Sequence, residues 1–70
     1  MSKEELRAEM IRHKDTNETL ADYLGISAAA LSLKMTAKRD FKLGELQKIK
    51  QRYDLTASDM ARIFFASEVA

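Results

Sequence analysis

The sequence predicts an all-α protein, a compact bundle of about five short helices. Its 70 residues include no proline and only two glycines, so the turn residues that punctuate a strand-rich chain are missing. Hydrophobic residues make up 46% of the chain, and they recur at helical spacing. A chain of this length holds one domain, so we expect residues 1–70 to form a single unit.

The first helix is predicted to begin at Ser2 and to end near Lys14 and Asp15. Ser2 and Glu5 have the spacing of a capping box, in which the two side chains satisfy exposed backbone N–H groups. The expected inward side carries Leu6 and Met10, with His13 as a further candidate.

Two short helices joined by a tight turn are predicted over about residues 16–36. Thr16 caps the first of them, which runs to Leu24, and Ser27 caps the second, which runs from Ala28 to about Thr36. Gly25 stands where a left-handed residue closes a helix without a Cβ clash. The residues expected to point inward are Leu20, Ala21, Leu24, Ile26, Leu31 and Met35. Such a pair lets its second helix stand out from the domain and enter a DNA groove.

A basic loop and two more helices are predicted to complete the chain. Phe41 anchors the loop, residues 37–42, to the core. The fourth helix covers about residues 43–53 and begins without a preferred capping residue, because Lys42 occupies that position. Thr56 and Asp59 indicate the cap of the fifth helix. Its inward side carries Met60, Ile63 and Phe64, whereas Phe65 points elsewhere.

Positive charge gathers in the middle of the sequence although the chain as a whole has a net charge of only +1. Residues 27–52 carry seven basic and two acidic groups, a net charge of +5, whereas the segments on either side are each net −2. A solvated basic surface would explain this pattern. Beside a protruding helix, it also fits a surface for phosphate.

The sequence resembles the phage repressor/Cro-type helix-turn-helix family, the lambda-repressor-like or Xre family. The resemblance is carried by Leu20-Ala21, Leu24-Gly25-Ile26-Ser27, Leu31-Ser32 and Met35. It continues through LSLKMTAKRDFKLGELQKIK and covers nearly the whole chain. It implies a small single-domain, sequence-specific transcriptional regulator that binds operator DNA with its third helix in the major groove.

The resemblance also implies which residues would contact DNA. Those facing the major groove would be Ser27, Ala28, Ala29, Ser32, Leu33 and Thr36. Asn17 matches the place where the family holds a phosphate, at a helix N-terminus suited to an anion. The cations expected to neutralise the backbone are Lys34, Lys38 and Arg39.

Two departures from the family pattern bear on these expectations. Ala28, Ala29 and Leu33 cannot hydrogen-bond to bases, so base reading would depend on contacts with thymine methyl groups and on Ser32 and Thr36. Ala37 stands where related sequences often have glycine. Either Ala37 adopts the left-handed cap at some cost, or the third helix runs one turn longer.

Phe65 and Val69 indicate a surface for self-association. At most two of the three side chains in Ile63-Phe64-Phe65 can face so small a core, which leaves Phe65, joined by Val69, for another surface. A two-fold homodimer would place two recognition helices about 34–36 Å apart, one turn of DNA. The other explanation is that the C-terminal tail folds back over Phe65.

The sequence argues against several other functions. It has no cysteine and one histidine, so we expect no metal site or cofactor. No carboxylate pair or nucleophile supports an enzyme or a small-molecule substrate. No apolar run approaches the roughly 20 residues that span a membrane, and a cytoplasmic protein is expected. The alternative to DNA binding is an interaction module on the same fold that binds and modulates a partner repressor.

Overall fold

Five helices follow one another along residues 1–65, the part of the chain that this computed structural model describes. They are α1 (Lys3–Arg12), α2 (Asn17–Leu24), α3 (Ala28–Met35), α4 (Leu43–Arg52) and α5 (Ala57–Phe64). The expected all-α bundle is confirmed, since residues 1–65 contain no strand. None of the helices in this range is long and apolar enough to cross a membrane.

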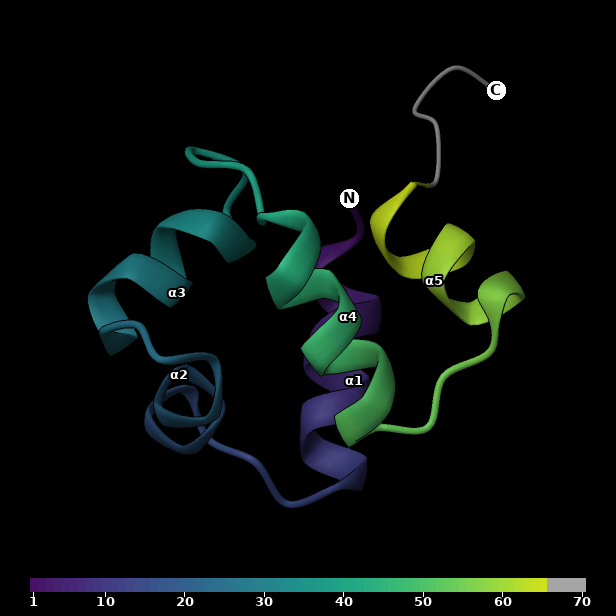
Figure 1. Cartoon of the computed structure of the whole chain (residues 1–70), viewed down its shortest axis with the longest axis horizontal. Helices are drawn as coiled ribbons and strands as arrows, with labels where there is room; N and C mark the ends of the chain where they lie inside the picture. Colours follow the sequence, from purple (N-terminus) through teal and green to yellow (C-terminus); the bar gives the residue numbers. More distant parts are fainter. Residues whose placement is uncertain (66–70) are drawn as a thin grey trace.

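The core lies where the five helices meet, and each helix contributes one side chain with no exposed surface. These side chains are Leu6, Leu20, Leu31, Ile49 and Ile63. In Figure 1, α4 lies in front of α1 at the centre, α2 and α3 lie at the left, and α5 lies at the right. The protein is therefore built around a central pair, with α3 and α5 at opposite edges.

Helix starts follow the hydroxyl residues that the sequence indicated. The side chains of Ser2, Thr16, Ser27 and Thr56 each accept a hydrogen bond from a backbone N–H three residues further on. The reciprocal half of the capping box predicted at Ser2 is wrong. Ser2 N–H donates to the carbonyl of Ile63 at 2.7 Å, and the Glu5 carboxylate binds Arg62. This exchange joins the start of α1 to α5.

The helices α1 to α4 are each followed by a residue with a left-handed backbone, and only one of these is a glycine. The φ angles are 60° at Lys14, 76° at Gly25, 63° at Ala37 and 51° at Asp54. After α3, Ala37 N–H donates to Lys34 O and Lys38 N–H to Leu33 O, the pair of bonds of a Schellman motif. Ala37 thus adopts the strained cap, and α3 does not run a turn longer.

Two aromatic residues predicted to face inward have different surroundings. His13 is exposed and is not part of the core; its ring stacks on Tyr53 with ring centres 4.7 Å apart. Phe41 is half-buried against the core, edge-on to Phe64 at 5.5 Å. Phe41 therefore anchors the loop between α3 and α4, as expected.

Candidate nucleic-acid interface

α3 lies at the edge of the protein, held to the core along one side. Leu31 and Met35 are buried, and α3 packs most closely against α2. Figure 1 shows α3 at the far left, on the side away from α5. The turn between α2 and α3, residues 25–27, closes with Ile26 half-buried against the core. The opposite side of α3 faces solvent.

The solvent side of α3 holds most of the residues expected to face a groove. Ser27, Ala29, Ser32 and Thr36 are exposed, and Leu33 is half-buried. Ala28 differs, because it packs partly against the core and lines a shallow groove with Arg7 and Asn17. Ala28 therefore lies at the margin of this surface rather than at its centre. We call the exposed four together with Leu33 the outer face of α3.

Most hydroxyl groups on the outer face already have backbone partners. Ser27 Oγ accepts from Ala30 N–H at 3.0 Å, and Thr36 Oγ1 donates to Ser32 O at 3.0 Å. The Ser32 hydroxyl makes no hydrogen bond within residues 1–65, so it is available to an outside group. The remaining surface offered to a partner consists mainly of methyl groups.

Lys34 was expected to bind phosphate, but it points into the protein. Its side chain is only 7% exposed, and Nζ lies 2.5 and 2.6 Å from the two carboxylate oxygens of Glu45 on α4. Burial raises the pKa of Glu45, but hydrogen bonds from Lys34 and from Lys42 N–H outweigh this and lower the pKa overall. Lys34 is therefore not on the outer face and is withdrawn from the set of phosphate contacts.

Lys38 and Arg39 are exposed just beyond the end of α3. Both backbone N–H groups donate to Leu33 O, at 2.9 and 3.2 Å, so the cap of α3 fixes where these residues begin. Neither side chain forms an ion pair within residues 1–65. The two cations therefore follow the outer face at the end of α3 with their charges available, and Arg39 also lines a pocket between α3, α4 and α5. Asp40, which follows them, is exposed as well.

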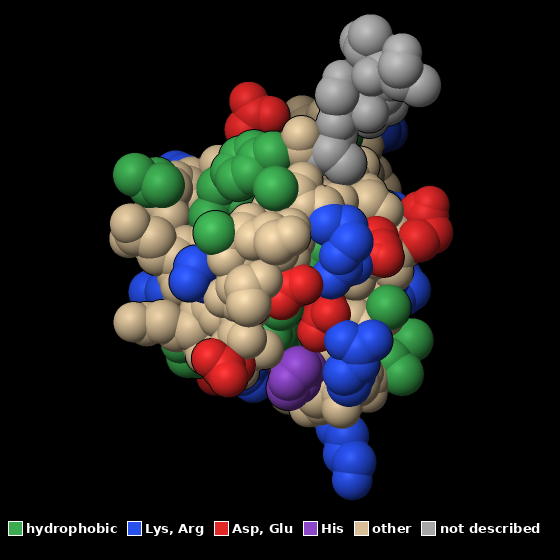
Figure 2. All heavy atoms as spheres, turned by 90° about the vertical axis from the view of Figure 1, so that its right-hand side faces the viewer, with side chains coloured by type: hydrophobic (Ala, Val, Ile, Leu, Met, Phe, Trp, Pro, Cys, Tyr) green, Lys and Arg blue, Asp and Glu red, His purple; other side chains and the backbone are tan. Residues whose placement is uncertain are grey.

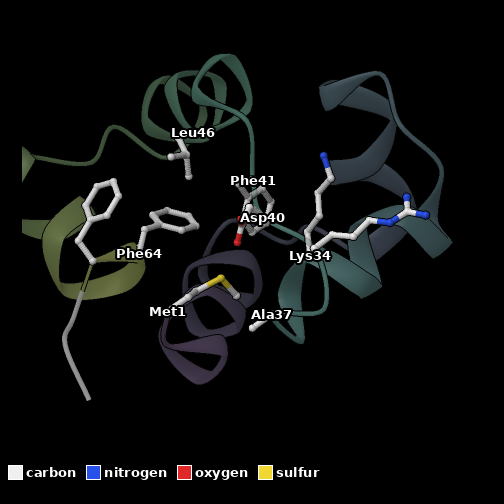
Figure 3. A pocket seen from close by; sticks show the side chains of 9 residues that line it. Met1, Lys34, Ala37, Asp40, Phe41, Leu46 and Phe64 are labelled. Atoms are coloured by element: carbon white, nitrogen blue, oxygen red, sulfur yellow. The ribbon is translucent and has the colours of Figure 1, made fainter. Parts of the chain in front are cut away.

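The loop that carries these cations also borders a pocket of about 310 Å³ between α3, α4 and α5. Figure 3 shows Phe41 and Phe64 turned toward one another in this pocket, with Leu46 above and Met1 below. The aromatic contact holds the loop against the bundle, so the segment from Ala37 to Phe41 is fixed at both of its ends.

Asn17 lies half-buried in the first turn of α2, where the resemblance implied a phosphate contact. The start of α2 is held by Asp15, whose carboxylate receives two hydrogen bonds from Arg52 at 2.7 and 2.8 Å and one from Tyr53 at 2.6 Å. The bonds from Arg52 lower the pKa of Asp15 well below its usual value, despite partial burial. Because Arg52 neutralises the charge of Asp15, the Asp15 carboxylate repels an anion at the start of α2 only weakly.

The structure reduces the basic region that the sequence indicated. Two of its seven cations, Lys34 and Arg52, are neutralised by Glu45 and Asp15. Sequence reasoning did not include Arg7, which lies in the groove beside Asn17. Arg7 is on the first helix, and only the fold brings it near Asn17. No pattern in the sequence around Arg7 therefore indicated that it would lie there.

A second exposed surface lies between α4 and α5 and is apolar. Leu43 is 71% exposed and Phe65 is 64% exposed, and both line a groove with Leu46, Ala57 and Met60. We call this set the α4–α5 groove. Figure 2 shows the side of the molecule that carries α5, with green side chains gathered near the top of the view. Val69, expected to extend this surface, lies outside the described residues.

Comparisons of the chain with protein-family models, with curated proteins and with solved structures find no match. A function for the protein therefore has to be inferred from its residues and their geometry.

Proposed function

We propose that this protein is a DNA-binding transcriptional regulator that places α3 in the major groove of duplex operator DNA. The observation that carries the proposal is the outer face of α3, exposed at the edge of the bundle and followed at the end of the helix by the exposed Lys38 and Arg39. α3 carries no acidic residue, so nothing on the helix itself repels a phosphate backbone.

The two parts of this surface would act differently. Lys38 and Arg39 would bind phosphates and set the register, independently of sequence. Ala29, Leu33 and Thr36 would touch thymine methyl groups, and the Ser32 hydroxyl would bond to a base edge. No covalent chemistry is needed, because a protein bound to an operator blocks polymerase sterically.

A homodimer fits the same proposal through the α4–α5 groove. Two large apolar side chains, Leu43 and Phe65, project beside a groove lined by apolar neighbours. A two-fold pairing would bury both copies of this surface at once. Two outer faces would then meet one duplex, which raises affinity beyond that of a single short helix.

The α4–α5 groove also gives the alternative function its support. A partner repressor could cover Leu43 and Phe65 in place of a second copy of this chain. In that case DNA binding by the isolated protein would be absent, and the activity would depend on Phe65.

A binding titration across salt concentrations tests the proposal. Fluorescence anisotropy with labelled random duplex, and with palindromic duplexes selected from a random pool, should show binding that weakens steeply as salt rises. Sedimentation of the same samples reports self-association and DNA binding together. Absence of binding even at low salt, with capture of a repressor that depends on Phe65, would favour the alternative.

A further inference from the structure

The ion pair between Lys34 and Glu45 is the buried charge pair that the proposed function does not use. Within the described chain, Lys34 and Glu45 are 6% and 8% exposed. The Glu45 carboxylate also accepts Lys42 N–H at 2.9 Å, at the start of α4. One carboxylate therefore binds the end of α3 and the beginning of α4 at the same time.

This pair joins two helices that otherwise make little contact. The closest helix contacts are α2 with α3, α1 with α5, and α2 with α4, so α3 and α4 are not among them. Leu31 and Met35 attach α3 to the core along one line. Apolar contacts are not directional, whereas the short charge-assisted bond from Lys34, on the same buried face, is directional and restricts rotation of the helix about its own axis.

The energetics of buried ion pairs point in the same direction. Removing two charges from water is costly, and well-packed apolar residues of similar volume often give equal or greater stability. A buried ion pair is therefore weak evidence that the pair stabilises the fold. Its presence is better explained by the orientation that it imposes on the two helices. Here the geometry it fixes is the direction in which the outer face of α3 points.

We infer that Lys34 and Glu45 are positioning residues that hold α3 at the rotation required for its outer face to meet DNA, and that Lys34 touches no phosphate. This inference rests on the proposed DNA binding. Both charges are internal to the pair, so replacing both together leaves the net charge and the exposed cations unchanged.

The test compares the double variant Lys34→Met/Glu45→Leu with the wild type, using the labelled duplex that the wild type selects from a random pool. We expect urea unfolding at an unchanged or higher midpoint, an affinity lower by about ten-fold or more, and an unchanged slope of affinity against salt. A slope lower by about 0.9 would mean that Lys34 contacts a phosphate, which overturns the inference. An unchanged affinity overturns it as well.

A second measurement needs no DNA. Residual dipolar couplings of backbone N–H groups report the orientation of each helix in solution, and in the double variant those of α3 should change while those of α1 and α5 stay as in the wild type. Unchanged α3 couplings would overturn the positioning role even if the protein bound no DNA at all. Failure of the wild type to bind DNA would instead overturn only the proposed function.

The matched control is Glu5→Gln/Arg62→Gln, which removes an ion pair joining α1 to α5. This pair also links two helices, but it lies on the α5 side of the bundle. We expect the control to leave both the affinity and the α3 couplings at the wild-type values.

Discussion

The exposed charged side chains at the two edges of the bundle differ in their partners. On the α1–α5 side, Arg62 binds Glu5 and also Asp59, with 3.1 Å between Arg62 Nη2 and the Asp59 carboxylate. Arg12 binds the buried Glu9 at 2.6 Å. Figure 2 shows this side, where red and blue side chains are interspersed. On the α3 side, Lys38 and Arg39 have no such partners within residues 1–65.

The difference teaches that net charge is a poor guide to where a charged partner binds. Within residues 1–65, a chain with a net charge of +1 pairs four of its twelve lysine and arginine side chains, and Lys38 and Arg39 are among the exposed cations that remain unpaired. These two follow directly after the uncharged outer face of α3 in the chain. Variants that alter the internal pairs and the exposed cations separately test this difference between the two edges.

The largest effect is expected from Asp15→Asn, which disrupts the internal pairing with Arg52. Asp15 has a lowered pKa in the folded protein, so its stabilising contribution is present above its usual pKa of 3.8 and is lost as pH falls from there through the lower pKa of the folded state. We expect the variant to lose about 2 kcal/mol of unfolding free energy at neutral pH. Its unfolding free energy should also fall less steeply than that of the wild type as the pH is lowered into the acid range.

Urea unfolding between neutral and acid pH measures this effect. The control is Asp54→Asn, an exposed aspartate with a left-handed backbone that asparagine also tolerates. If the unfolding free energy of the Asp15 variant fell as steeply with decreasing pH as that of the wild type, the Asp15–Arg52 pair would not stabilise the folded protein.

A smaller effect is expected from Lys38→Ala/Arg39→Ala, which removes the exposed cations beside α3. All duplexes should bind about ten-fold to thirty-fold more weakly, with the salt slope lower by about 0.9 for each phosphate that is no longer neutralised. The control is Lys3→Ala, since Lys3 is also exposed and lies at the start of α1, next to Ser2, which bonds to Ile63 of α5. An equal weakening in the control would mean that binding is spread over the whole surface.

Ala37→Gly should stabilise the fold by about 1 kcal/mol. Ala37 has φ of 63°, a conformation that costs an ordinary residue about 1–2 kcal/mol, and part of the gain is offset by the greater freedom of glycine in the unfolded chain. Thermal or urea unfolding measures the difference. The reverse change in the same cap type, Gly25→Ala, should destabilise by a similar amount, since a Cβ there meets open space but φ is 76°.

The smallest effect is expected from a change in the DNA. Replacing thymine by deoxyuridine removes a methyl group and nothing else, and each methyl that packs on Ala29, Leu33 or Thr36 should be worth about 0.8 kcal/mol, or about four-fold in affinity. Anisotropy titration with substituted duplexes reads this directly. If every substituted duplex bound as tightly as its parent, base reading would have to depend on Ser32 or on DNA shape.

Local chemistry made the helices and their boundaries predictable. Hydroxyl residues at Ser2, Thr16, Ser27 and Thr56 mark helix starts, because each has a side-chain acceptor for an exposed N–H. The exposure of Phe65 was predictable too, since Met60, Ile63 and Phe64 already fill the inward side of α5. These inferences involve residues within a turn or two of one another.

Contacts between distant segments were not predictable from the sequence in the same way. The bond between Asp15 and Arg52 spans 37 residues, and no local pattern indicates it. Lys34 could have been recognised, since it lies three residues after the buried Leu31 and beside Met35. A charged residue on a buried face calls for a partner, and Glu45, a helix-start carboxylate in the fourth helix, was available.

The hydrogen bond from Ser2 to Ile63 joins two residues at opposite ends of the described chain. Closing so large a loop costs entropy that local contacts must first offset, although the cost grows only slowly with loop length. The α2–α3 pair closes across three residues and can form early, whereas the α1–α5 contact needs nearly the whole polypeptide. We expect the folding rate of this all-helical chain to be set by that ring closure rather than by helix formation.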